Sequence, residues 1–214
     1  MWFLAASGLR AQTLRITTSQ YDNMRTGANL GETILTPQNA NARQFGKIRS
    51  LPVDGAVYAQ PLYLSQVNVP GKGPLNLLFV ATEHDSVYAF DTARNSPDPV
   101  WHVNLLPDNT GSSTVAAWDV QCPFISPEIG ITATPVIDIE TGTIFVLTRT
   151  KSRAGFVSPP TYSQQLHALA ITTGHEKFGG RWRSVLPSLV QVREARVAKS
   201  ASTLCVKIRE LLSC

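Results

Sequence analysis

One phrase occurs twice in this chain, and its repetition restricts the fold more than any other feature. Each copy begins with a proline, continues with an apolar triplet, and ends with a four-residue segment. At the centre of that segment a tyrosine or histidine is followed by alanine. The copies are Pro61, Leu78–Val80 and Val87–Phe90, and then Pro135, Ile144–Val146 and Leu166–Leu169. A unit repeated in the same order indicates a repeat architecture.

Each copy is typical of short strands joined by turns. Leu77–Thr82 and Val87–Asp91 are apolar, β-branched and aromatic runs separated by a polar break, which is hairpin spacing. In the second copy, Thr141-Gly142 lies between Val136-Ile137 and Ile144–Thr148. Glycine there allows the positive φ of a hairpin turn. The sequence therefore predicts an all-β fold.

An aromatic residue closes each copy, Trp101 in the first and Phe178 in the second. Phe45-Gly46-Lys47 matches Phe178-Gly179-Gly180, so a third, incomplete unit is expected to end near Lys47. Units of four strands with a closing aromatic are typical of β-propeller blades, and the chain has room for about two and a half of them in an incomplete ring. An all-β sandwich is the main alternative, but it does not predict an ordered repeat.

The units resemble the pyrroloquinoline quinone (quinoprotein-type) propeller repeat. The residues that carry the resemblance are Val87-Tyr88-Ala89-Phe90-Asp91 and Leu166-His167-Ala168-Leu169 with Thr173-Gly174. The segments Tyr21-Asp22-Asn23, Leu35–Asn39 and Phe45–Lys47 also follow the order found at the start of quinoprotein dehydrogenases. The resemblance covers about residues 15–180 and implies the fold more specifically than the chemistry.

The family's cofactor site lies on the axis of a ring of seven or eight blades, often above a pair of adjacent cysteines. This chain has no Cys-Cys pair, and Cys122 stands alone in its segment. We therefore carry over no catalytic, cofactor-binding or metal-binding residue. Pyrroloquinoline quinone and calcium are implied only if the chain is part of a quinone-dependent dehydrogenase, and no other cofactor is indicated.

The basic character of the chain lies in its last 34 residues. Residues 181–214 contain seven basic and two acidic residues, which leaves 12 basic and 13 acidic residues in positions 1–180. Residues 12–180 are expected to form the partial propeller, and residues 181–214 a basic tail outside it, helical or disordered. We prefer a reading-frame shift after Gly180 as its origin. No nucleic-acid motif accompanies the charge.

The first residues suggest export. Residues 1–11 resemble the end of a secretory signal with cleavage after Ala11, although a basic n-region is missing. A frayed apolar N-terminus is the alternative. A secreted or periplasmic protein is expected, and no run is long enough to span a bilayer. The three cysteines, Cys122, Cys205 and Cys214, define no disulfide framework.

Two segments attract attention as sites. Glu83-His84-Asp85 offers three ligand types for a metal. Adjacent residues of an extended chain point to alternating faces, however, so a structural role in the hairpin turn is preferred. The insertion Ala116–Gly130, with Trp118, Asp119, Cys122, Pro123, Pro127 and Glu128, is where a ligand is expected first. Its alternative role is to cover a blade edge.

The remaining candidates favour structural roles. His167 takes the place of Tyr88 in the repeat, so packing or hydrogen bonding is expected of it. His102 and His175 are expected to be exposed, and Trp101 and Phe178 to pack between blades. No phosphate-binding loop, nucleophile elbow or HExxH motif occurs.

The sequence thus favours an exported, incomplete propeller that acts as a non-catalytic scaffold or binding module for a protein or carbohydrate. The alternatives are a fragment of a quinone-dependent dehydrogenase and a truncated product without activity. Open blade edges leave backbone groups unpaired, so self-association is also expected.

Overall fold

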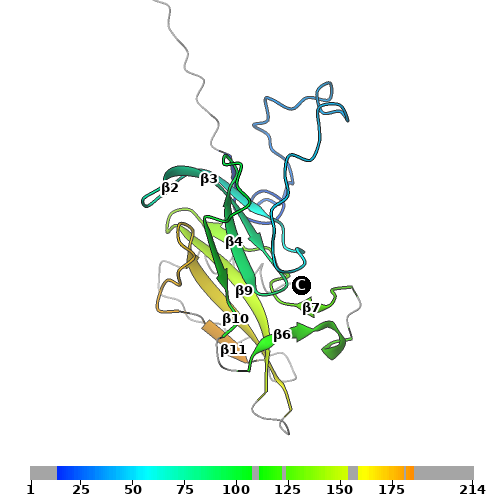
Figure 1. The fold of residues 1–214 in the computed structure, drawn as a ribbon, viewed down its shortest axis with the longest axis vertical. Coiled ribbons are helices and arrows are strands. Elements are labelled where there is room, and N and C mark those ends of the chain that lie inside the picture. The colour runs from blue at the N-terminus through cyan, green and yellow to red at the C-terminus, as the bar shows by residue number, and fades with distance from the viewer. Residues whose placement is uncertain (1–13, 108–110, 122–123, 154–158, 181, 186–214) are drawn as a thin grey trace, which may run out of the picture.

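A computed structural model describes residues 14–107, 111–121, 124–153, 159–180 and 182–185 of the chain. The expected all-β class is confirmed, because the helical content of these residues is a single 3-10 turn, η1 (Ala117–Asp119). The described residues form eleven strands in two antiparallel sheets (Figure 1). Within the described residues, the structure contains no helix with the length and apolar character needed to traverse a membrane.

The first sheet has its strands in chain order. They are β1 (Arg15–Ile16), β2 (Leu62–Val69), β3 (Gly73–Ala81), β4 (Ser86–Asp91) and β5 (Trp101–Asn104). The register of β2 against β3 shifts between Leu64 and Val67, where Gln66 has a φ of 57°. This bulge lets β2 bend while its ends stay paired.

The second sheet has the order β11-β10-β9-β6-β7, and β8 also pairs with β9. Its strands are β6 (Ser113–Ala116), β7 (Glu128–Ile129), β8 (Val136–Asp138), β9 (Thr143–Ser152), β10 (Thr161–Ala170) and β11 (Trp182–Val185). The expected turn between β8 and β9 is present, and Gly142 in it has a φ of 61°.

Each sheet contains the same four-strand meander, β2–β5 in the first and β8–β11 in the second. The register repeats as well, since Phe79 pairs with Ala89 and Phe145 pairs with Ala168. The expected repetition is therefore present as two antiparallel meanders. The described strands leave both sheets open and form no closed ring, so their arrangement as propeller blades stays a prediction.

The two sheets share one hydrophobic core. Leu62, Leu77 and Val87 of the first sheet are fully buried in the same cluster as Ile144 and Leu169 of the second. Burial of such side chains contributes about 1.5–3 kcal/mol each. Side chains alternate between the two faces of a strand, so each sheet directs one row of apolar side chains into this cluster. Packing between the rows of the two sheets holds the sheets together.

The segment around β1 also joins the sheets. Leu14 accepts a hydrogen bond from the backbone N–H of Ser65 in the first sheet, at 3.1 Å. Thr17 accepts one from the N–H of Ile137 in β8, at 2.8 Å. This short segment therefore links the two meanders through backbone hydrogen bonds.

The third, incomplete unit expected to end near Lys47 is not formed. Residues 17–61 contain no strand, only turns and an isolated bridge between Thr18 and Tyr21. In Figure 1 much of this segment, blue to cyan, loops away from the sheets. Leu30 and Ile48 are 93% and 96% exposed there. The match of Phe45–Lys47 to the closing motif was local, because the described residues before it contain only the two-residue β1, which pairs with β2 of the first sheet.

The second sheet continues beyond Gly180, where the tail was expected to begin, because β11 pairs with β10 through Val185. The expected signal at residues 1–11, the tail beyond Val185, and Cys122, Cys205 and Cys214 lie outside the described residues.

Candidate functional site

The two segments singled out in the sequence lie against each other. We call Glu83-His84-Asp85, at the β3–β4 connection, the acidic turn. The N–H of Gly130, at the end of the Ala116–Gly130 insertion, donates to Glu83 Oε2 at 2.7 Å. The N–H of Ile131 donates to the carbonyl of Thr82 at 3.3 Å. The insertion is thus held on the acidic turn by backbone groups.

The absence of a side chain at Gly130 allows the insertion to lie directly against the acidic turn. A Cβ at this position would lie 2.2 Å from the carbonyl oxygen of Glu83 and 2.7 Å from Asp85 Oδ1. Only glycine leaves room for the acidic turn there. The sequence offered no signal of this contact, because the two segments are about 45 residues apart and share no motif.

Glu83 is a buried carboxylate with one satisfied oxygen. It is 0% exposed, and Oε2 also accepts from the Thr132 hydroxyl at 3.0 Å. Its other oxygen, Oε1, has no hydrogen-bond partner among the described residues. Burial raises the pKa of Glu83, while the Gly130 N–H, the Thr132 hydroxyl and the Arg149 charge oppose that rise.

Asp85 has a buried carboxyl with even fewer hydrogen-bond partners than that of Glu83. It is 0% exposed, it has a φ of 53°, and neither carboxyl oxygen accepts a hydrogen bond of good geometry within the described part of the chain. Burial raises its pKa to about 8, with contributions from the charges of Glu83 and Glu128; the nearby backbone N–H and charge of Arg149 oppose the rise. Asp85 is therefore mostly protonated at pH 7, since a buried neutral acid costs much less than a buried charge.

His84 points the other way, toward the surface. Its Nδ1 lies 3.0 Å from Glu128 Oε1, and the His84 side chain is 42% exposed. The hydroxyl of Thr114 donates to Glu128 Oε2 at 2.5 Å. His84 and the two carboxyls thus separate as the alternation of an extended chain predicts. Among the described residues, no three His, Cys, Asp or Glu side chains are placed to hold a metal ion.

The insertion is anchored at its other end to the second sheet. Asp119 Oδ2 accepts a hydrogen bond from Lys151 of β9 at 2.6 Å. Trp118 and Phe124 project from it and are 74% and 84% exposed. The insertion therefore bridges the acidic turn and β9. Its alternative role as a cover over a blade edge stays a prediction.

His167 lies in a hydroxyl–imidazole–carboxylate chain. Its Nε2 is 3.2 Å from the Thr148 hydroxyl, and its Nδ1 is 2.5 Å from Glu176 Oε1. A nucleophile needs access to its substrate, but Thr148 and His167 are 0% and 1% exposed. The chain links β9, β10 and the following turn, so the hydrogen-bonding role expected of His167 is confirmed.

Trp101 connects the two meanders, as expected. Its indole N–H donates to the carbonyl of Ile171 in the second sheet at 2.9 Å. A Cβ on Gly174 would lie 2.6 Å from the indole ring, so the ring lies directly against this glycine. The tryptophan of one unit thus packs on the Thr-Gly turn of the next.

Phe178 differs from Trp101, because the described residues contain no unit after it on which its ring could pack, and its packing between units stays a prediction. The N–H groups of Val100 and Lys177 make equivalent hydrogen bonds to Ala89 and Ala168, so the two aromatics hold equivalent chain positions. Phe178 has a φ of 55°, and its ring is turned outward and 58% exposed. His102 and His175 are exposed, as expected.

No protein-family model, no curated protein and no solved structure matches this chain. The functional assignment therefore depends on the residues and contacts described above.

Proposed function

We propose that this chain is part of an exported β-propeller of the pyrroloquinoline quinone-like repeat type, and that it serves as a binding or scaffold module without catalytic activity. One observation carries the proposal. Trp101 closes the first meander and hydrogen-bonds to Ile171 of the second, with its ring against Gly174. A contact from the end of one repeat to the turn of the next is what tandem units need in order to stack.

The buried polar groups support a structural role in preference to catalysis. The acidic turn is enclosed by the insertion, and the hydroxyl–imidazole–carboxylate chain at His167 is enclosed between strands. Both groups tie separate elements together. The Glu83 and Asp85 carboxyls, the Thr148 hydroxyl and the His167 ring are buried, so they lack the access to substrate that general acid–base or nucleophilic catalysis requires.

The experiment titrates purified protein with pyrroloquinoline quinone in the presence of calcium, followed by calorimetry and quinone absorbance. We expect no saturable binding. Binding at micromolar concentration or tighter would instead favour the second candidate, a fragment of a quinone-dependent dehydrogenase.

The same preparation tests the third candidate, a truncated product without activity. A chain that cannot complete its core is expected to self-associate through open strand edges. A monodisperse monomer that melts cooperatively would contradict this candidate and agree with a folded module.

A further inference from the structure

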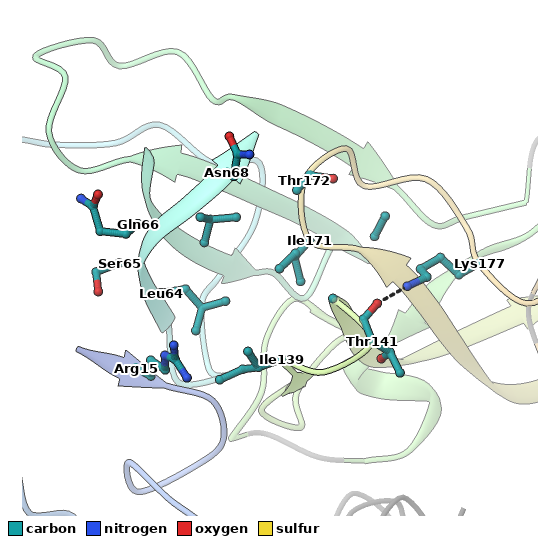
Figure 2. Close-up of a pocket in the computed structure, with 13 residues that line it drawn as sticks. Arg15, Leu64, Ser65, Gln66, Asn68, Ile139, Thr141, Ile171, Thr172 and Lys177 are labelled. Carbon is teal, nitrogen blue, oxygen red and sulfur yellow. Dashed lines mark hydrogen bonds between the residues drawn. The ribbon is translucent and has the colours of Figure 1, made fainter. Parts of the chain in front are cut away.

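A groove lies between the two sheets, at the end of β3 opposite the acidic turn, and we call it the inter-sheet groove. It has a volume of about 440 Å³. One wall is the bulged part of β2, residues 64–68, and the other is formed by the β8–β9 turn and the residues after β10 (Figure 2). This volume is within the range of small-molecule sites.

The middle of the groove is aliphatic. Leu64, Ile139 and Ile171 converge from three different elements in Figure 2, and Val67 of the bulge also lines the groove. Leu64 and Ile171 are 4% and 9% exposed, so they belong to the core, whereas Ile139 is 40% exposed. The groove therefore offers a short apolar surface that is continuous with the core but open to a ligand.

The charge in the groove is entirely positive. Arg15 and Lys177 line it, and no aspartate or glutamate is among its lining residues, all of which belong to the described part of the chain. Apart from these two residues, positions 1–180 contain 13 acidic and 10 basic residues. Two cations beside an apolar surface that has no carboxylate in its lining favour an anion over a neutral or cationic ligand.

The two cations differ in their freedom. Lys177 Nζ donates to the carbonyl of Thr141 and to the Thr143 hydroxyl, which fixes the ammonium at one rim (Figure 2 draws the bond to Thr141). The Arg15 side chain is exposed on β1 and makes no side-chain hydrogen bond or ion pair within the described residues. Its planar fork is suited to bind a carboxylate through two parallel hydrogen bonds.

We propose that the inter-sheet groove binds a small organic acid with an aliphatic chain, the carboxylate on Arg15 and the chain against Ile139 and Leu64. This inference deepens the binding role proposed above and rests on it. It does not require a closed ring, because every residue involved lies in the described strands and turns.

The experiment titrates the full chain with sodium octanoate by calorimetry. Sodium acetate tests the carboxylate without a long aliphatic chain, and 1-octanol tests the aliphatic chain without a charge. Arg15→Glu reverses the charge at the rim, and Ile139→Glu places an acid in the aliphatic part. The matched controls are Arg43→Glu and Ile34→Glu, at exposed positions in the irregular segment 17–61. Circular dichroism checks that each variant is folded.

We expect saturable 1:1 octanoate binding that weakens at least tenfold in both groove variants and is unchanged in both controls. Acetate and 1-octanol should bind at least tenfold more weakly than octanoate. Three results would each overturn the proposal: no saturable octanoate binding, an octanoate affinity in the Arg15 or the Ile139 variant equal to that of the parent, or 1-octanol binding as tight as octanoate binding. None of these results bears on the quinone titration, so failure of the groove and failure of the proposed function are distinguishable.

Discussion

Replacing Asp85 by asparagine tests the protonated buried carboxyl. The substitution keeps the shape of the side chain and removes its charge. The pKa of Asp85 rises from 3.8 in the unfolded reference to about 8 in the folded protein, so the folded state holds the proton more tightly. The stabilising effect of this proton is fully present below the unfolded pKa and is lost as pH rises through the folded pKa. The parent therefore loses stability between about pH 4 and pH 8.

The magnitude follows from the shift. Each pKa unit corresponds to about 1.36 kcal/mol, so Asp85 contributes a slope of up to about 1.4 kcal/mol per pH unit within this window. Relative to pH values below 4, the shift lowers the parent's free energy of unfolding at pH 7 by up to about 4 kcal/mol. Asp85→Asn avoids this loss because asparagine does not titrate. The new amide has its own unpartnered groups, at about 1–3 kcal/mol. The variant should thus be more stable than the parent at pH 7.5, and equal or less stable at pH 4.5.

The assay is urea unfolding followed by tryptophan fluorescence at several pH values between 4.5 and 8. Asp98→Asn serves as the matched control because Asp98 is an exposed aspartate, and it should follow the parent at every pH. A difference between parent and Asp85→Asn that is the same at all pH values would refute the reasoning. It would mean that Asp85 is ionised in the folded protein and is compensated by Arg149.

Two further substitutions test the contacts that hold the units and the insertion in place. Trp101→Phe removes the indole donor and leaves the Ile171 carbonyl without it, so we expect a loss of about 1–3 kcal/mol in the free energy of unfolding. Trp118→Phe, at an exposed ring, should change it by less than about 0.5 kcal/mol, and equal losses in the two variants would argue against the inter-sheet bond. Gly130→Ala forces a Cβ into the backbone of the acidic turn and should cost about 1–3 kcal/mol or more, measured by urea unfolding. Gly46→Ala, which has no atom within 4 Å of its new Cβ, is the control, and a harmless Gly130→Ala would contradict the close approach.

The repeat phrase predicted the local structure well because each copy carries its own strand and turn chemistry. The turn at Gly142 and the pairing of Phe79 with Ala89 follow from alternating apolar residues and from glycine at a positive φ. The role of Trp101 was also predictable, because a large ring at a recurrent position has to be buried by a neighbouring unit. Phe178 shows the limit of this reasoning, since the residue at the equivalent position is 58% exposed where the described residues contain no following unit to bury it.

The site was less predictable because its parts are joined only by tertiary contacts. The acidic turn looked like an ordinary polar turn, and its burial comes from Gly130, far along the chain. The inter-sheet groove was missed altogether. It is formed by Arg15, the bulge of β2 and Ile171, three segments that share no motif and meet only when the sheets pack.

The most direct test of the account is amide hydrogen exchange in the parent and in Trp101→Ala. The proposed function depends on two repeat units that stack as one body around Trp101. We predict that the β3–β4 and β9–β10 amides exchange with similar protection in the parent and lose protection together in the variant. Loss confined to β3–β5, with β9–β10 unchanged, would contradict the stacking of the units and with it the proposed module.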